Sequence, residues 1–198
     1  MAMSGSTVVA LEGAHGTGKS TLAHALVAHY KARSVNAALV SETARRSGFV
    51  EAVVIHGSGT FSLEAELQLF AAHIAEEQLA ARNHELLVCD KTIANVVGYA
   101  RLLIPDTHDS TRLLDAMAKL AAAYSPYYDE VLYMSETYDL SMTKDPYRPS
   151  DRTFQLDADR HIRRACEDAG IRLAHLPNGL DLESKVVWAS QRIDRVLM

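Results

Sequence analysis

Cysteine is scarce in this chain, and long apolar runs are missing from it. Only Cys89 and Cys166 occur among 198 residues, too few for a disulfide framework and unlike the spacing of a metal site. No uninterrupted apolar stretch approaches the roughly 18 residues that a membrane helix requires. Residues 1–6 lack a basic region, and the apolar run that follows them is too short for a signal peptide. We therefore expect a cytoplasmic protein with reduced thiols and no membrane partner.

Positive charge is also in short supply. The chain has 20 Lys and Arg against 25 Asp and Glu, a net charge of −5 with histidine neutral, which argues against broad non-specific DNA binding. The basic residues are nevertheless concentrated in one segment, which contains Lys144, Arg148, Arg152, Arg160, Arg163, Arg164 and Arg172. A local basic segment in an acidic protein favours a small polyanion as ligand. The nine histidines show no spacing typical of a zinc site.

Short apolar runs alternate with longer helical patterns, which is typical of a parallel α/β sheet. The predicted strands are Thr7–Leu11, Ala38–Ser41, Leu86–Cys89, Glu130–Met134 and Ile171–Leu176. The predicted helices are 18–32, 62–82, 92–103, 110–123, 155–169 and 181–197, with Ser62 and Asp181 as N-caps. The length fits one domain and no linker divides it, so we expect a single domain over residues 1–198.

A phosphate-binding motif follows the first predicted strand. Residues 13–20 read Gly-Ala-His-Gly-Thr-Gly-Lys-Ser, a full GxxxxGK[ST] pattern between a strand and a helix. Such a loop wraps backbone N–H groups around a polyphosphate and aims a helix N-terminus at it. The predicted nucleotide-binding residues are Gly13, His15, Gly16, Thr17, Gly18, Lys19, Ser20 and Thr21. Lys19 would reach the β- and γ-phosphates and act in catalysis, Ser20 would hold Mg²⁺, and His15 would fill space.

Asp90 and Lys91 close the third predicted strand. Ligands of parallel α/β sheets lie beyond the carboxyl ends of the strands. A carboxylate at that edge can bind Mg²⁺ or accept a proton from an attacking hydroxyl, so Asp90 is a candidate metal ligand and catalytic residue. The alternative is that Asp90 caps the helix that starts at Thr92. Lys91 either touches phosphate or is solvated.

Glu42 and Arg45 follow the second predicted strand in the same way. Glu42 could hold a sugar hydroxyl or an amide of the phosphoacceptor, and Arg45 could pair with an anionic group of that substrate. The alternative is a helix cap at Glu42 or Thr43 and two exposed arginines, Arg45 and Arg46.

The segment from Asp145 to Arg152 contains two prolines, which restrict the backbone without forming a helix. We therefore expect a lid-like loop around residues 139–155, in which Arg148 and Arg152 neutralise the charge of the transferred phosphoryl group. The alternative is a surface loop with Arg152 paired to Asp151 or Asp157. The remaining arginines of this region, Arg160, Arg163 and Arg164, are expected on a solvated helix face.

The pattern also predicts positions for Glu66 and His73, for Tyr124–Tyr128 and for Trp188. Glu66 and His73 lie seven residues apart on one predicted helix face, which either faces the acceptor site or is exposed. The aromatic stretch Tyr124–Tyr128 is expected to pack against the sheet. Trp188 is expected in the core or in an interface.

Taken together, these motifs resemble the P-loop kinase group, and within it the nicotinamide-riboside-kinase-type ATPase domains, which are often labelled AAA-like. The resemblance rests on Leu11–Leu22, Ser41–Arg45, Leu87–Asp90, Tyr128–Asp129 and Asp145–Arg152. It implies a three-layer α/β fold with a five-stranded parallel sheet of order 2-3-1-4-5. Nucleoside and thymidylate kinases of the same group carry an Asp-Arg pair after strand three, and Lys91 replaces that arginine here.

The function predicted from these observations is an ATP- and Mg²⁺-dependent kinase that acts on a nucleoside, nucleotide or related small metabolite. One alternative is a kinase that acts on modified bases or ends in DNA. Another is a regulatory module that hydrolyses ATP or GTP slowly and signals by ordering a loop. The sequence does not specify the phosphoacceptor or the choice between ATP and GTP.

Overall fold

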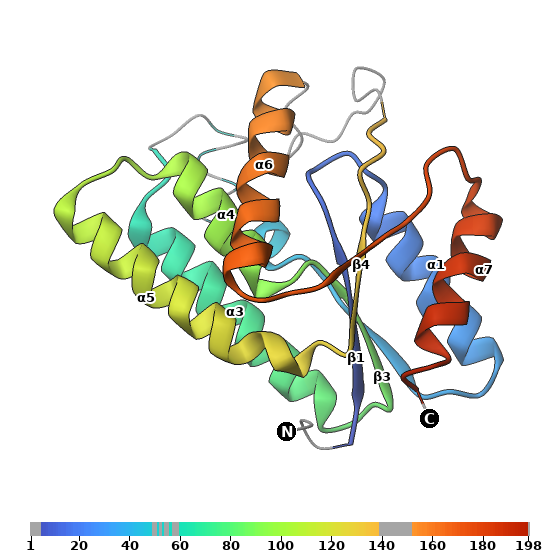
Figure 1. The fold of residues 1–198 in the computed structure, drawn as a ribbon. Helices are drawn as coiled ribbons and strands as arrows, with labels where there is room; N and C mark the ends of the chain where they lie inside the picture. Colours follow the sequence, from blue (N-terminus) through green and yellow to red (C-terminus); the bar gives the residue numbers. More distant parts are fainter. Residues whose placement is uncertain are drawn as a thin grey trace.

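A single parallel sheet forms the centre of the molecule. The computed structural model describes residues 5–48, 51, 53, 56, 60–138 and 152–197. Within them, five strands pair in parallel in the order β2-β3-β1-β4-β5 (Figure 1). The strands are β1 (Thr7–Glu12), β2 (Ala37–Val40), β3 (Leu86–Asp90), β4 (Glu130–Tyr133) and β5 (Leu173–His175). All five predicted strands are confirmed to within a few residues at each end, as is the order that the resemblance implied.

Helices cover both faces of this sheet, which confirms the three-layer architecture. They are α1 (Lys19–Ala32), α3 (Leu63–Ala81), α4 (Ile93–Leu103), α5 (His108–Tyr124), α6 (Arg152–Asp168) and α7 (Leu182–Ile193), with 3-10 helices η1 (Thr43–Arg46) and η2 (Ser125–Tyr127). In Figure 1, α1 and α7 lie on one side of the sheet, and α3, α4, α5 and α6 lie on the other. No helix in the described part of the chain is long and apolar enough to cross a membrane.

The central strand β1 is apolar on both of its faces. Val8 and Ala10 belong to the core beneath α3–α6, and Val9 and Leu11 belong to the core beneath α1 and α7. All four are at most 1% exposed, and burial of a Val or Leu side chain contributes about 1.5–3 kcal/mol. Trp188, expected in a core or an interface, lies partly buried against the second of these cores. Strands flank β1 on both edges and helices cover both of its faces, so the position at which the following loop begins is fixed.

Helix ends are set by capping side chains. Ser62 and Asp181 each accept a hydrogen bond from the backbone N–H three residues later, so both predicted N-caps are confirmed. The helix predicted at 110–123 begins earlier, at His108, because Thr107 and Ser110 form a reciprocal capping box.

The expected lid falls largely outside the described residues, and so does Arg148. Its described end, residues 152–155, forms the first turn of α6, which begins at Arg152 and not at the predicted residue 155. Residues 152–155, which were predicted to belong to the loop, are therefore helical.

The predicted packing of Tyr124–Tyr128 against the sheet is confirmed, since Tyr124 and Tyr128 are buried in the core beneath α3–α6. The Tyr128 hydroxyl accepts a hydrogen bond from Ile93 N at 2.9 Å and donates one to the Glu77 carboxylate at 3.0 Å. Glu77 also lies 3.1 Å from His73 Nε2. This buried chain of contacts ties α3 to the first turn of α4.

Close packing of α4 against α6 depends on Gly98. A Cβ atom at this position would lie 2.8 Å from the Ile162 Cα atom and 3.0 Å from its backbone N. Such a contact forces the two helix backbones apart, because a backbone atom cannot rotate away as a side chain can.

We predict that Gly98→Ala destabilises the protein by about 1–3 kcal/mol in urea unfolding, through this overpacking. Helix propensity alone would stabilise the variant by about 1 kcal/mol, so the sign of the change is diagnostic. Gly48→Ala is the control, because a Cβ at Gly48 meets no atom within 4 Å. An increase in the free energy of unfolding for Gly98→Ala would contradict the packing described here.

Candidate functional site

The loop between β1 and α1 is shaped by glycines with positive φ. Gly13, Gly16 and Gly18 have φ angles of 138°, 76° and 85°, a region that other residues rarely adopt. A Cβ on Gly13 would lie 2.4 Å from the Met134 carbonyl oxygen, so only glycine fits there. Gly18 is the N-cap of α1 and has no side chain to cap it. The first N–H groups of α1 therefore remain available to an anion in the loop.

Lys19 lies within this loop and is almost fully buried. Its ammonium group donates hydrogen bonds to the Ala14 carbonyl at 2.6 Å and to the Thr17 hydroxyl at 3.3 Å. Burial lowers the pKa of Lys19 to about 8, although the neighbouring Asp90 carboxylate opposes this effect. A bound polyphosphate would supply the negative charge that the buried ammonium group requires.

Ser20 and Asp90 join the loop to the end of β3. The Ser20 hydroxyl, in the first turn of α1, donates a hydrogen bond of 2.5 Å to Asp90 Oδ2. The other oxygen, Asp90 Oδ1, is buried and has no hydrogen-bond partner among the described residues. The N-cap of α4 is Thr92, without a side-chain cap bond, so the alternative that Asp90 caps this helix is wrong. A hydroxyl beside a carboxylate with a vacant oxygen is a donor set that suits Mg²⁺.

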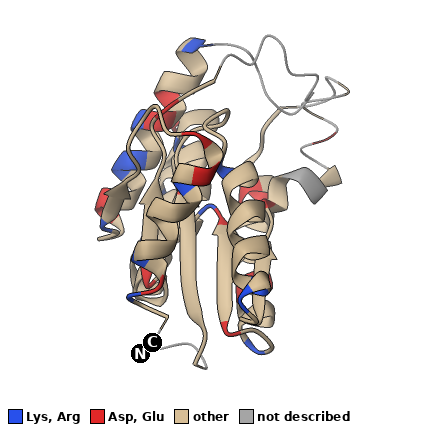
Figure 2. Ribbon diagram, turned by 90° about the vertical axis from the view of Figure 1, so that its right-hand side faces the viewer, with Lys and Arg blue, Asp and Glu red and all other residues tan. Residues whose placement is uncertain are grey.

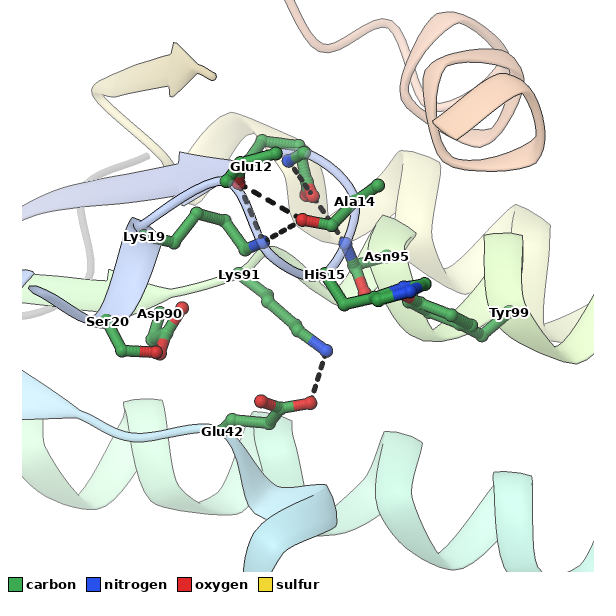
Figure 3. A network of polar contacts seen from close by, with 12 residues as sticks. Glu12, Ala14, His15, Lys19, Ser20, Glu42, Asp90, Lys91, Asn95 and Tyr99 are labelled. Carbon is green, nitrogen blue, oxygen red and sulfur yellow. Dashed lines mark hydrogen bonds and ion pairs between the residues drawn. The ribbon is translucent and has the colours of Figure 1, made fainter. Parts of the chain in front are cut away.

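Lys91 and Glu42 form an ion pair on the β2 side of the loop (Figure 3). The Lys91 side chain is 13% exposed, so the alternative that it is solvated is wrong. Burial lowers the pKa of Lys91, but the Glu42 carboxylate outweighs this and raises it overall. Glu42 is the N-cap residue of η1, as the alternative predicted, but its side chain makes no cap hydrogen bond and pairs with Lys91 instead. Arg45 follows in η1, and its side chain lies outside the described part of the structure.

The backbone at Lys91 is strained. Its φ angle is 110°, which is costly for a residue with a Cβ and is found mostly at functional sites. At this turn the Asp90 side chain lies beside Ser20, and the Lys91 side chain points toward Glu42, as the labelled sticks in Figure 3 show. The Lys91 ammonium also lies 5.0 Å from the centroid of the Tyr99 ring, and the Tyr99 hydroxyl is 3.2 Å from His15 Nδ1.

Glu12 is a central residue of the site that sequence reasoning missed. Its fully buried carboxylate accepts hydrogen bonds from Gly13 N at 2.8 Å, from the Thr92 hydroxyl at 2.7 Å and from Asn95. It thereby connects the start of the phosphate loop to the start of α4. The available signal was an acidic residue at the end of an apolar strand, directly before the first glycine of the motif.

A second cluster lies on the β4 side of the loop and also escaped the sequence analysis. Tyr138 donates its backbone N–H to the Gly16 carbonyl at 3.0 Å, and its ring would lie 3.3 Å from a Cβ on Gly18. The buried Lys185 ammonium pairs with the Glu136 carboxylate at 3.0 Å and with the Tyr138 hydroxyl. Lys185 belongs to α7, and its position in the helix pattern gave no sign of this role.

Arg152 lies at the start of α6 and contacts Thr137 and Gln155. The Gln155 amide donates to the His15 carbonyl at 2.7 Å, which connects α6 to the phosphate loop. Asp157, one of the partners considered for Arg152, is paired with Arg160 at 2.9 Å.

The other α6 arginines match their prediction of a solvated face. Arg160, Arg163 and Arg164 are exposed and pair with carboxylates of their own helix. Figure 2 shows basic and acidic positions interleaved along the helices.

Glu66 and His73 are buried on the inner face of α3, at 3% and 1% exposure, so the alternative that they are exposed is wrong. Burial raises the pKa of Glu66 to about 7, although Lys91 acts in the opposite direction. Helix α3 packs against η1 and β2, which flank Glu42, so Glu66 in its first turn lies on the same side of the loop as the Glu42–Lys91 pair.

Solved structures share this fold. The NadR protein in complex with NR has a TM-score of 0.71 and 19% identity, and the match covers 98% of this chain and 52% of that chain. Thymidylate kinase from Candida albicans has a TM-score of 0.69 and 16% identity, with 96% and 92% covered. Deoxyadenosine kinase from M. mycoides has a TM-score of 0.68 and 13% identity, with 96% and 100% covered. This chain therefore spans about half the length of NadR but nearly all of the two kinases.

A search of curated proteins finds no match to the sequence. A family model described as an AAA domain matches residues 8–184, from the first buried residues of β1 into α7. That range contains the phosphate loop, the Asp90–Lys91 turn and the inner face of α3. The protein therefore belongs to this AAA domain family, with the fold of the P-loop kinases.

Proposed function

We propose that the protein is a kinase that uses ATP and Mg²⁺ to phosphorylate a hydroxyl group of a nucleoside, nucleotide or related small metabolite. The observation that carries this proposal is the Ser20–Asp90 hydrogen bond, with Asp90 Oδ1 left without a partner in the described structure. This hydrogen bond places two oxygen groups that could bind Mg²⁺, the Ser20 hydroxyl and the Asp90 carboxylate, at the phosphate loop. Asp90 Oδ1 lies at the same place and could accept a proton. The fold shared with two nucleoside and nucleotide kinases supports the same conclusion.

The phosphate donor would be bound by the residues of the loop. The amides from Gly13 to Thr21 would hold the triphosphate, and Lys19 would lie against the β- and γ-phosphates. Ser20 would hold Mg²⁺ directly and Asp90 would hold it through a water molecule, which leaves Asp90 Oδ1 available to the acceptor; when bound, Mg²⁺ neutralises charge on the phosphate oxygens.

The reaction forms a bond between the acceptor oxygen and the γ-phosphorus and breaks the bond between that phosphorus and the β,γ-bridging oxygen. Asp90 Oδ1 would orient the acceptor hydroxyl and take its proton, while ADP leaves with the electron pair. Arg148 and Arg152 would neutralise charge on the transferred group. Most of the catalytic effect would come from positioning and electrostatics.

The order of the strands suggests how the two substrates are arranged. Asp90 ends β3, and Lys91 and Glu42 follow β3 and β2, all on one side of the loop, whereas Tyr138 follows β4 on the other side. The acceptor must approach the γ-phosphate beside Asp90, where Glu42 and Arg45 would contact it. The nucleoside end of ATP would then extend toward Tyr138.

Asp90→Asn is predicted to lower kcat by about 100-fold or more, because the amide cannot accept the proton and binds Mg²⁺ weakly. The measurement is transfer of labelled γ-phosphate from ATP to a panel of nucleosides, nucleotides and DNA. Asp115→Asn is the matched control, since Asp115 is exposed on α5. Near-normal turnover in Asp90→Asn would overturn the assigned role.

The same panel separates the kinase from its two alternatives. Release of labelled phosphate without any acceptor, together with a partner that binds in only one nucleotide state, would indicate a regulatory module. Label that enters DNA, with a steep dependence on salt, would indicate a DNA kinase.

A second prediction concerns pH and follows from the pKa of Lys19, about 8. Bound phosphates stabilise the ammonium form, so binding above this pKa takes up a proton. The Kd for ATP is therefore lowest well below pH 8, where Lys19 is already protonated. Above pH 8 it increases, with a slope that approaches ~tenfold per pH unit. Calorimetric titrations at several pH values measure this slope.

Lys19→Arg is the control for this prediction, because a guanidinium group stays charged throughout the range. Its Kd is expected to vary less with pH than that of the wild type. A wild-type Kd that stays constant up to about pH 9.5 would show that Lys19 does not contact the phosphates as a titrating group.

A further inference from the structure

The inner face of α3 contains a carboxyl group without a partner. Residues 66, 70, 73, 77 and 81 form one inward stripe of this helix, and all five are buried. Glu77 and His73 on this stripe pair with each other. The Glu66 carboxyl group makes no hydrogen bond or ion pair with another described residue, although Glu66 is only 3% exposed. A buried carboxyl group without a hydrogen-bond partner destabilises the folded protein. A ligand that donates a hydrogen bond to Glu66 would offset this cost, so the unpaired group points to a ligand.

Glu66 belongs to the acceptor side of the phosphate loop. It lies in the first turn of α3, and this helix packs against both η1 and β2, which flank Glu42. The Lys91 charge acts on Glu66, and the Lys91 ammonium is itself paired with Glu42. Figure 3 shows Glu42, Lys91 and Asp90 arranged along this side of the loop.

The charges gathered there favour some acceptors over others. The described side chains on this side provide three carboxyl groups, on Glu42, Glu66 and Asp90, and one ammonium group, on Lys91, beside the Lys19 ammonium group that would lie against the phosphates of ATP. Lys91 is already paired with a carboxylate. An acceptor that carries its own phosphate would meet the Glu42 and Asp90 carboxylates, and Glu66 in its ionised form, at a cost, because like charges repel strongly in a buried site. Hydroxyl and amino groups would instead donate hydrogen bonds to them.

We propose that Glu66 is a further acceptor-binding residue and that, together with Glu42, it selects an acceptor without negative charge, namely a nucleoside and not a nucleoside monophosphate. This inference rests on the proposed kinase activity and narrows its substrate class. Glu66 accepts hydrogen bonds from hydroxyl or amino groups of the acceptor. It does not touch the transferred phosphoryl group, which would lie against Lys19.

The test compares nucleosides with their 5′-monophosphates as acceptors of labelled γ-phosphate, using the full chain with saturating ATP and Mg²⁺. The common ribo- and deoxyribonucleosides form the panel, each beside its own monophosphate. The expected result is transfer to at least one nucleoside, with kcat/KM at least ~10-fold above that of its monophosphate. Preferential transfer to a monophosphate would overturn the inference and leave the kinase activity standing. Label that enters no acceptor would overturn both.

Glu66→Gln distinguishes ligand binding from a purely structural role. The amide keeps the shape of the side chain, so KM for the nucleoside is expected to rise ~10-fold or more, with kcat and KM for ATP little changed. The preference against the monophosphate should shrink as well. Glu64→Gln is the matched control, because Glu64 lies in the same turn and is exposed.

Unfolding in urea accompanies these measurements and shows whether each variant is folded. If Glu66→Gln is unfolded, Glu66→Asp takes its place, because it keeps the charge and shortens the side chain. An unchanged KM and an unchanged preference in a folded variant would overturn the role of Glu66. Arg45→Ala supplies a further check, since transfer to a monophosphate that depends on Arg45 would show that the site is built for an anionic acceptor.

Discussion

The site depends on the hydrogen bonds that the buried Glu12 carboxylate accepts. The carboxylate accepts hydrogen bonds from Gly13 at the start of the phosphate loop and from Thr92 and Asn95 at the start of α4. Removal of the carboxylate would leave several buried donors unpaired at once, each at about 1–3 kcal/mol. The loop and the Asp90–Lys91 turn therefore share one support, and their relative position is set by it.

Much of the fold could be predicted because its signals are local. The apolar runs of β1 and β3 identify buried parallel strands, and residues 13–20 identify the loop between a strand and a helix. The positions of Glu42 and Asp90 at strand ends also predict that both belong to the site, since the carboxyl ends of parallel strands lie at one edge of the sheet. The partners of these residues were harder to predict, because Lys91 pairs with a residue 49 positions away.

The residues that sequence reasoning missed are those whose surroundings form only in three dimensions. Lys185 occupies a polar position in the pattern of α7 but is buried against Glu136 and Tyr138. The pattern around Glu66 and His73 was also compatible with an exposed face, because α3 buries ionisable groups along the stripe that usually holds apolar ones. Periodicity identifies the inward face of a helix only when that face is apolar.

The positive φ of Lys91 implies a trade-off between stability and chemistry at one backbone position. A glycine would adopt this conformation without strain, and release of the strain is worth about 1 kcal/mol or more. It would also remove the ammonium group that faces Glu42 and the Tyr99 ring. The chain thus accepts backbone strain at residue 91 in order to place a cation there. A glycine at this position would make the fold more stable, but it would remove a charged group from the candidate site.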